Sequence, residues 1–383
     1  MDMAQALALA SGALVATNLA SILIAGHRLD RAGAPPPDLR KTPPVSIVVP
    51  VRGIETFSEE TLERAFSLAW PCYELVFCAA HGNDPVVPLI ERIAAAHPEI
   101  EARILVGDER IGANPKLNNC VKGWQAARHD WVILADSNVL MPPDYIRHLM
   151  GGWRGDSGLV CSTPLGSRPD GFWAEVECAF LNTQQARWQY AGEALGLGFA
   201  QGKSMLWAKP MLDANGGIHA LNAEIAEDAA STKLVNRLGL KVHLVSAPFE
   251  QPLGRRTGQE IWSRQCRWSR LRRVTFPGFF APEILLGVLP PLLLAMLAVL
   301  FADTRLAPAL LLVAAGIYLP EIALAYAKGW RLSRWSVPAM VVRDCMMPVI
   351  WLRAWLGGAI DWRGNTMTIG TNACELKEAP AGP

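Results

Sequence analysis

The 383-residue chain has few charged residues and almost no net charge. Charged side chains make up 19% of the sequence, whereas a soluble domain usually carries about 25%. Hydrophobic residues reach 51%, and 36 basic against 35 acidic residues leave a net charge of +1. The composition excludes a disordered or collagen-like chain and disfavours a purely soluble protein. The small net charge gives no overall positive electrostatic field that would attract nucleic acid.

Several common metal and nucleotide motifs are also missing. The eight cysteines include no CxxC pair, and no two histidines stand at metal-ligand spacing. A zinc ribbon or a CxxC redox motif therefore has no support, and scattered thiols are typical of small buried side chains in a reducing compartment. The expected strand-end loops contain neither GxGxxG nor a P-loop sequence, which disfavours both kinds of nucleotide site.

The hydrophobic residues are concentrated at the two ends of the chain. Residues 3–26 contain no charge, and this is about the length needed to cross a bilayer. A signal peptide is the alternative, but Asp2 stands where its basic region would be. The basic residues His27, Arg28 and Arg31 follow the segment. By the positive-inside rule they predict an outside N-terminus and a cytoplasmic domain after it.

Two to three further membrane helices are predicted towards the C-terminus. Residues 284–302 are uncharged, and residues 306–327 are nearly so. Residues 335–358 are less apolar and contain the adjacent pair Arg343 and Asp344. These two side chains could neutralise each other within a helix bundle, or the segment could be interfacial or re-entrant. We favour a membrane helix.

Between these ends, predicted strands and helices alternate. Continuous β-branched runs, typical of strands buried on both faces, begin the pattern. The predicted strands span 45–50, 73–79, 102–106 and 131–135. The predicted helices span 59–69, 85–97 and 115–127. Such alternation implies an α/β fold with a mostly parallel sheet covered by helices. We predict an anchor at 1–30, a Pro-rich linker at 31–44, a functional domain at 45–275, membrane helices at 276–360 and a tail at 361–383.

Polar loops follow three of the predicted strands. In parallel α/β sheets the ligand binds beyond the carboxyl ends of the strands, which singles out residues 51–55, 81–84 and 136–138. Asp136 comes directly after a hydrophobic strand. A carboxylate there is well placed to hold a divalent metal against a diphosphate, although a helix cap or a turn residue is a serious alternative.

Two charged motifs lie further along the chain. Glu227 and Asp228 open a predicted helix, where acidic residues are ordinary partners of the helix dipole. Arg264, Arg267 and Trp268 belong to a basic stretch next to the C-terminal apolar block. A juxtamembrane patch that attracts anionic lipid is one interpretation of this stretch, and a catalytic role can coexist with it.

The order of these motifs resembles the signature of family 2-type glycosyltransferases, D, D, D, (Q/R)xxRW, and more closely that of the ceramide glucosyltransferase family. The matching residues are Asp84, Asp136, Asp228 and Arg264-x-x-Arg267-Trp268. The block Asn114-Pro115-Lys116-Leu117-Asn118-Asn119 matches that family's NPKxNN element. The resemblance covers nearly the whole chain, and its strength lies in the joint order of motifs that are individually weak.

The resemblance implies a GT-A (nucleotide-diphospho-sugar transferase) fold in a multi-pass protein of a bacterial inner membrane, with its catalytic domain facing the cytoplasm. It further implies inverting transfer of a hexose from a UDP-sugar, UDP-glucose first, to the primary hydroxyl of ceramide. The expected partners are this donor, a ceramide-like acceptor and membrane lipid, and not nucleic acid. The alternatives are an N-acetylglucosaminyltransferase acting on a hopanoid lipid, a processive polysaccharide synthase, or a non-catalytic nucleotide-sugar-binding membrane protein.

The resemblance also suggests roles for individual residues. Asp228 is expected to be the general base, because inversion requires a carboxylate on the face opposite UDP. Glu227 is the alternative base, and it and Trp268 are expected near the acceptor or sugar. Asp136 is expected to hold Mg²⁺ or Mn²⁺, but Asn138 replaces the second acid of a DxD motif, so metal dependence is less strict. The expected donor-binding residues are Arg52, Glu55, Asp84, Lys116, Asp136, Arg264 and Arg267.

The stretch from Phe172 to Trp207 is rich in aromatic and small residues. We interpret it as the acceptor-side region, with a plain packing helix and a glycine loop as the alternative. Within it, Gln201-Gly202-Lys203-Ser204 stands where the resemblance places a loop that closes on the donor sugar.

Overall fold

The computed structural model describes residues 1–31, 38–39, 41–302, 306–357, 359–362 and 365–368. The linker predicted at 31–44 and the tail predicted at 361–383 lie partly outside the described residues. The chain divides into two compact units built from separate stretches of sequence. We call Ala32–Arg168 with Gly192–Gly254 the sheet unit, and Met1–Arg31, Pro169–Ala191 and Arg255–Pro383 the helical unit. The functional domain predicted at 45–275 draws on both units, and its boundaries stay a prediction.

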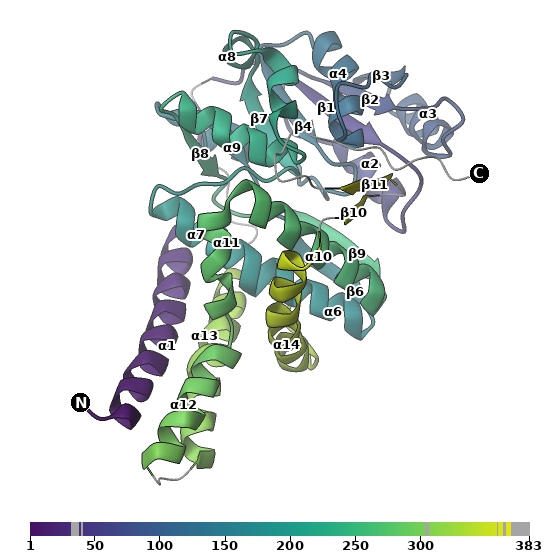
Figure 1. Cartoon of the computed structure of the whole chain (residues 1–383). Helices are drawn as coiled ribbons and strands as arrows, with labels where there is room; N and C mark the ends of the chain where they lie inside the picture. The colour runs from purple at the N-terminus through teal and green to yellow at the C-terminus, as the bar shows by residue number, and fades with distance from the viewer. Residues whose placement is uncertain (32–37, 40, 303–305, 358, 363–364, 369–383) are drawn as a thin grey trace. The chain divides into compact units, whose positions relative to one another are not determined.

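The sheet unit contains a seven-stranded sheet (Figure 1) in the order β3-β2-β1-β4-β7-β5-β8. Its strands are β1 (Val45–Val51), β2 (Tyr73–Ala79), β3 (Glu101–Val106), β4 (Trp131–Ala135), β5 (Ser157–Cys161), β7 (Ser204–Ala208) and β8 (Lys241–Leu244). β7 runs antiparallel to its neighbours β4 and β5, while the other adjacent pairs are parallel. The mostly parallel α/β sheet expected of a GT-A domain is therefore confirmed.

The central strands form because their sequences are continuous hydrophobic runs. β1 reads VSIVVPV and is buried along nearly its whole length, as is every residue of β2. Ile47, Phe77 and Ile133 are fully buried in one hydrophobic core, which residues of the helices complete. β2 and β4 have the predicted bounds, 73–79 and 131–135; β4 is an apolar run between Asp130 and Asp136, and β2 is apolar apart from Glu74. β5, β7 and β8 were not expected, since their sequences mix apolar residues with glycine, serine, lysine or histidine.

Helices connect and cover these strands. They are α2 (Ser58–Ala65), α3 (Val86–Ala96), α4 (Pro115–Ala126), α5 (Tyr145–Gly151), α8 (Lys209–Asp213), the 3₁₀ helix η2 (Gly217–Ala223) and α9 (Glu227–Arg237). A separate two-stranded sheet, β6 (Leu165–Asp170) with β9 (Glu250–Arg255), forms where the chain passes from one unit to the other.

The helical unit contains mostly long helices. They are α1 (Met3–Arg28), α6 (Phe172–Ala179), the π-helix η1 (Phe180–Ala186), α7 (Arg187–Ala194), α10 (Gly258–Thr275), α11 (Pro277–Phe280), the 3₁₀ helix η3 (Ala281–Leu285), α12 (Leu289–Ala302), α13 (Leu306–Lys328) and α14 (Ser336–Trp355). A short antiparallel hairpin, β10 (Ala359–Trp362) and β11 (Asn365–Thr368), follows.

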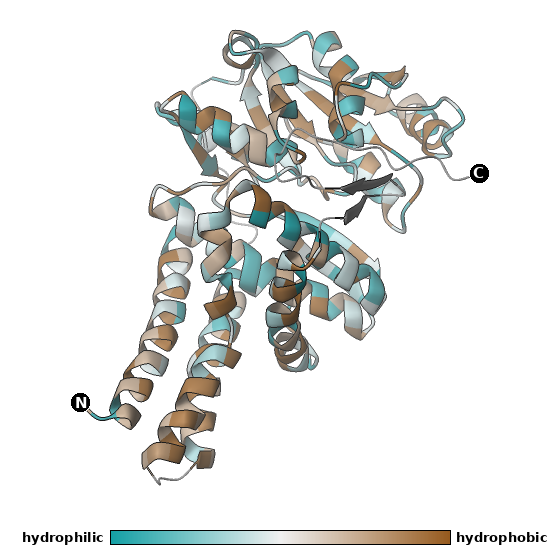
Figure 2. Cartoon of the chain, in the orientation of Figure 1, coloured by the Kyte–Doolittle hydropathy of each residue, from teal (hydrophilic) through white to brown (hydrophobic). Residues whose placement is uncertain are grey.

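Within the described part of the chain, α1 and α13 are each long and apolar enough to cross a membrane. The stretch from α11 to α12 is bent by 45° and adds a third candidate if it is one broken span. Hydrophobic residues cover most of α12 in Figure 2. The predicted apolar helices at both ends are therefore confirmed as membrane candidates. α14 is not among them, and whether residues 335–358 span a membrane stays a prediction.

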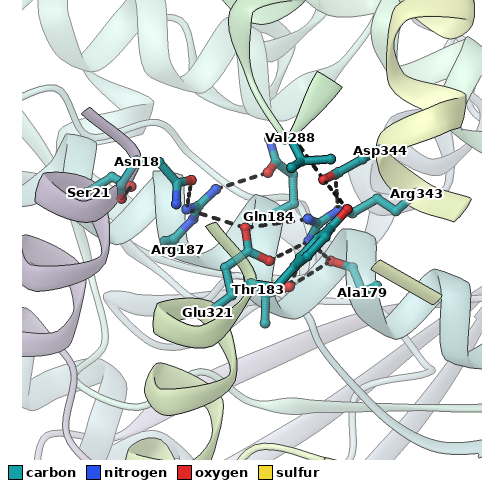
Figure 3. Close-up of polar contacts among 11 residues, drawn as sticks. Asn18, Ser21, Ala179, Thr183, Gln184, Arg187, Val288, Glu321, Arg343 and Asp344 are labelled. Carbon is teal, nitrogen blue, oxygen red and sulfur yellow. Dashed lines mark hydrogen bonds and ion pairs between the residues drawn. The ribbon is translucent and has the colours of Figure 1, made fainter. Parts of the chain in front are cut away.

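Four charged side chains are completely buried among the helices of this unit (Figure 3): Arg187, Glu321, Arg343 and Asp344. Arg343 contacts Oδ1 of Asp344 through Nε at 2.8 Å and Oε2 of Glu321 through Nη1 at 2.9 Å. Arg187 lies 3.6 Å from Oε1 of Glu321. We call these four residues the buried charge network. Its two positive and two negative charges balance, which is how ionised groups can be accommodated among apolar helices.

Neutral groups complete the hydrogen bonds of the network. Thr183 accepts a 2.8 Å hydrogen bond from Arg343, and Gln184 accepts one of 3.1 Å from Arg187. The other oxygen of Asp344, Oδ2, accepts hydrogen bonds from the Val288 amide at 3.0 Å and the Tyr318 hydroxyl at 3.2 Å. The network therefore links α7, α13 and α14 with the start of α12 through directional contacts as well as through packing.

Candidate active site

The antiparallel strand β7 places a lysine beside the carboxylate that follows β4. Ala135 pairs with Ser204 in the β4–β7 ladder, and the next amide along, that of Asp136, donates a 2.9 Å hydrogen bond to the carbonyl of Lys203. The Nζ of Lys203 consequently lies 2.8 Å from Oδ2 of Asp136. The carboxyl edge predicted from parallel strands thus also receives a residue from the beginning of an antiparallel one.

A second lysine reaches the same carboxylate from α4. Asn114 caps this helix because its Oδ1 accepts hydrogen bonds from the amides of Lys116 at 3.0 Å and Leu117 at 3.1 Å, and a proline occupies the first helical position. Nζ of Lys116 lies 2.7 Å from Oδ1 of Asp136 and 2.7 Å from Oε1 of Glu227. The expected residues Lys116, Asp136 and Glu227 are therefore brought together.

The beginning of α9 supplies two adjacent carboxylates. Glu227 is buried, and its Oε2 accepts a 2.6 Å hydrogen bond from Nδ2 of Asn114. Asp228 is partly exposed, and the amide of Ala229 donates a 2.8 Å hydrogen bond to its Oδ1. Gly202 passes close to both acids, and its carbonyl accepts a hydrogen bond from Lys116. We call Lys116, Asp136, Lys203, Glu227 and Asp228 the carboxylate–lysine cluster.

The acids of the cluster have opposite electrostatic environments. Burial, reinforced by the neighbouring Glu227 carboxylate, raises the pKa of Asp228 to about 7. Burial also opposes ionisation of Asp136, but the ammonium groups of Lys116 and Lys203 outweigh it and hold the pKa of Asp136 well below its usual range. The two carboxylates of Asp136 and Glu227 in turn raise the pKa of Lys116 above its ordinary value despite burial. Asp228 is the member of the cluster suited to exchange a proton near neutral pH.

Asp84 organises the loop after β1. Its carboxylate oxygens accept hydrogen bonds from the amide of Gly53 at 2.9 and 3.1 Å, and Oδ1 also accepts one of 3.0 Å from the amide of Val86. Gly53 has a φ of +67°, which glycine adopts without strain. Arg52 and Glu55 flank this loop and are exposed. Asp84 thus fixes the backbone of this loop. The donor contacts predicted for Arg52, Glu55 and Asp84 stay predictions.

Arg264, Arg267 and Trp268 lie half-buried on α10, in the helical unit. Arg264 forms an ion pair with Glu177, which is completely buried and also lies 3.4 Å from Nε of Arg256. Glu177 is therefore a positioning partner of the first arginine of the RxxRW motif. The predicted contacts of Arg264, Arg267 and Trp268 with donor or acceptor stay predictions.

The residues around Asp136 do not form a carboxylate site ready for Mg²⁺ or Mn²⁺. No three His, Cys, Asp or Glu side chains converge as metal ligands anywhere in the described residues. Each oxygen of Asp136 is contacted by an ammonium group, and Oδ1 of Asn138 accepts a 2.9 Å hydrogen bond from Nζ of Lys203. A divalent cation at Asp136 would have to displace Lys203, Lys116 or both.

Two members of the site were not among the predicted residues. Asn114 had a detectable signal, since an asparagine before a proline is a typical start of a helix, but its bond to Glu227 depends on tertiary structure. Lys203 lies in the segment 201–204, which the resemblance placed as a loop that closes on the donor sugar, but its contact with Asp136 follows from an antiparallel strand that was not expected. The predicted acceptor-side stretch 172–207 is split between helices of the helical unit and β7 of the sheet unit, and its role stays a prediction.

Comparison with known proteins shows to which family the chain is similar. A family model described as Glycosyl transferase family 21 matches residues 8–374. Ceramide glucosyltransferase 1 of Caenorhabditis elegans is 30% identical over 259 residues, which cover 67% of this chain and 55% of that protein. Ceramide glucosyltransferase 3 of the same organism is 26% identical over 330 residues, covering 84% and 72%. The chain thus spans little more than half the length of the first of these relatives.

Solved structures show more distant similarity. A mannosyltransferase from Pyrobaculum calidifontis in complex with GDP-Man and Mn²⁺ matches with a TM-score of 0.49 and 17% identity, over 88% of this chain and 99% of that one. Glucosyl-3-phosphoglycerate synthase from Mycobacterium tuberculosis, in complex with Mn²⁺, UDP and its product, matches with a TM-score of 0.40 and 16% identity, over 64% and 87%.

Proposed function

Since the chain belongs to glycosyl transferase family 21, we propose that it transfers a hexose from a UDP-sugar, UDP-glucose first, to the primary hydroxyl of ceramide with inversion at the sugar. Its similarity to two ceramide glucosyltransferases supports the acceptor class and the sugar. The described geometry supports the chemistry separately, through the carboxylate–lysine cluster at the edge of the sheet.

The observation that carries the proposal is the contrast between Asp228 and Asp136. Asp228 is a carboxylate whose pKa of about 7 suits a general base at neutral pH, whereas two lysines keep Asp136 ionised. Glycosyl transfer with inversion needs one base at the acceptor hydroxyl and positive charge at the leaving diphosphate. The cluster offers both kinds of group within one edge of one sheet.

In the proposed step the acceptor oxygen attacks the anomeric carbon of the sugar. The new carbon–oxygen bond forms as the bond between that carbon and the diphosphate oxygen breaks, and UDP leaves with the bonding electron pair. The hydroxyl proton passes to Asp228, whose neighbour Glu227 disfavours a second negative charge and so strengthens the base. Lys116 contacts both Asp136 and Glu227, and it thereby fixes the distance between Asp136 and the adjacent acids Glu227 and Asp228.

The lipid acceptor gives the apolar helices a role. α1 and α13 are candidate membrane spans, so a hydrophobic acceptor held in a bilayer could meet a water-soluble donor. Basic residues lie in the last turn of both helices, His27 and Arg28 in α1 and Lys328 in α13. By the positive-inside rule we place these ends, and the catalytic residues, on the cytoplasmic side of a bacterial inner membrane.

The experiment is a transfer assay with membranes that contain the full chain. Radiolabelled UDP-glucose, UDP-galactose and UDP-N-acetylglucosamine are each offered with ceramide or with a hopanoid lipid, and labelled lipid is separated and counted. We expect labelled product with ceramide, most from UDP-glucose. Labelling of the hopanoid alone would favour the related N-acetylglucosaminyltransferase, and a labelled polymer would favour a processive synthase. Absence of any labelled ceramide overturns the proposal.

A further inference from the structure

The ammonium group of Lys203 has three hydrogen-bond donors, and its contacts among the described residues use two of them. A lysine ammonium carries three N–H donors. Those of Lys116 contact Asp136, Glu227 and the carbonyl of Gly202. Among the described residues, Nζ of Lys203 contacts two acceptors, Oδ2 of Asp136 at 2.8 Å and Oδ1 of Asn138 at 2.9 Å. Its side chain is 19% exposed, so its third donor can reach a ligand at the edge of the sheet.

Asp136 and Asn138 hold this ammonium in the place where a pair of acids would hold a metal. Two carboxylates separated by one residue would offer a divalent cation two negatively charged ligands. Here the second position is an amide, and its oxygen and the Asp136 oxygen both accept from Lys203. One carboxylate charge and one neutral amide oxygen match the single positive charge of an ammonium group better than the two charges of a divalent cation. The residue pair is thus suited to orient a lysine.

We propose that Lys203, oriented by Asp136 and Asn138, is the cation that binds the diphosphate of the donor and stabilises the leaving group, in place of a divalent metal ion. The inference rests on the proposed function, because it concerns the same donor. Lys116, whose three donors are occupied, keeps Asp136 and Glu227 in position. Lys203 is thus a further donor-binding residue, and Asp136 acts on the diphosphate through it.

Binding of UDP to the purified full chain in detergent, measured by calorimetry, tests the inference without requiring turnover. Uridine serves as the ligand that lacks the diphosphate. We expect the wild type to bind UDP equally with EDTA and with added Mg²⁺ or Mn²⁺. Lys203→Met should weaken UDP binding at least about tenfold, the size expected for a lost hydrogen bond to a charged group, and leave uridine binding unchanged. Lys203→Arg should retain more of the UDP affinity than Lys203→Met.

Lys241→Met is the matched control, because Lys241 is exposed and pairs with Asp156 outside the cluster. It should leave UDP binding unchanged. The measurement with EDTA uses the wild type, so it decides the question even if a Lys203 variant does not fold. UDP binding that EDTA abolishes and Mn²⁺ restores, or UDP affinity that Lys203→Met leaves intact, overturns the inference while sparing the proposed function. Failure of the wild type to bind UDP under any condition overturns the proposed function itself.

Discussion

Asn114 joins the beginning of α4 to the beginning of α9, because its Nδ2 donates a 2.6 Å hydrogen bond to Oε2 of Glu227 while its Oδ1 caps α4. One side chain thereby sets the position of Lys116, two residues later, and of Glu227, 113 residues later. Asn114→Ala should lower the free energy of unfolding by about 1 kcal/mol or more through the lost cap. It should also lower the transfer rate, because Glu227 loses a partner. Denaturant unfolding and the labelled-lipid assay measure the two effects.

The variant Asn114→Asp separates the cap from the contact. An aspartate keeps the cap acceptor but places a second carboxylate against Glu227. We expect the stability of α4 to be largely retained and the transfer rate to fall. If Asn114→Asp transfers sugar as fast as the wild type, the contact with Glu227 has no catalytic consequence.

Asp228→Asn should reduce the transfer rate by at least about 100-fold, the contribution typical of a positioned general base. In the wild type the base is protonated below its pKa of about 7. The rate should therefore rise with pH, about tenfold per unit below pH 7, and level off above it. Initial rates between pH 5.5 and 8.5 measure this. A rate that does not change across pH 7, or a variant with near wild-type turnover, contradicts the assignment.

The same substitution should stabilise the fold. An aspartate whose pKa is higher in the native than in the unfolded state makes the protein less stable as pH rises from the unfolded pKa to the native one. For Asp228 that window runs from its ordinary value to about 7. Asp228→Asn should therefore unfold at a higher temperature than the wild type at pH 8, and the difference should vanish near pH 4. Thermal unfolding at the two values checks the sign.

Gly202→Ala should disturb the cluster from the loop side. A methyl group at this position would lie 2.8 Å from Oε1 of Glu227 and 3.2 Å from Nζ of Lys116. Because displacements of about 1 Å cost up to about 100-fold in rate, we expect a fall of that order with little loss of stability. Gly155→Ala is the control, since nothing lies within 4 Å of its added methyl group. Equal rates for both variants would show that the loop adapts without cost.

Arg343→Met should destabilise the helical unit, because it leaves the buried Asp344 without its cation and leaves Glu321 with the more distant Arg187, 3.6 Å away. Breaking one partner of a buried ion pair costs about 3–5 kcal/mol. The purified variant should unfold at a lower temperature in detergent, or accumulate poorly. Arg334→Met, which removes an exposed arginine of the same unit, should unfold like the wild type. A thermal shift no larger for Arg343→Met than for Arg334→Met would contradict the role of the network.

The part of the fold that could be predicted is the part encoded by local pattern. β4 matches its predicted bounds because it is an apolar run between Asp130 and Asp136, β2 matches them as a run that is apolar apart from Glu74, and Asp136 was found by its place after β4. Lys116 was expected near the diphosphate from the resemblance, and the structure places it against Asp136. The sequence also separated the apolar ends from the α/β centre, since hydropathy depends little on tertiary contacts.

What could not be predicted depends on pairing between distant segments. β7 is a short strand after a glycine-containing loop, and no local pattern states that it runs antiparallel beside β4. The contact of Lys203 with Asp136 therefore had no signal in the sequence, and the hydrogen bond of Asn114 with Glu227 had none either. The sequence also did not predict that Pro169–Ala191 belongs to the helical unit rather than to the sheet unit, because this depends on which distant segments it packs against.

The buried charge network has a consequence for how the helices can be assembled. α12 and α13 consist mostly of leucine, alanine and other apolar residues, whose contacts are less directional than hydrogen bonds and ion pairs. Moving α14 by a single residue would turn its side chains about 100° around the helix axis. Arg343 would then lose Glu321, and Asp344 would lose the Val288 amide and the Tyr318 hydroxyl. Only one rotational setting keeps every charge paired. The buried charge network thus gives this bundle of apolar helices one preferred register.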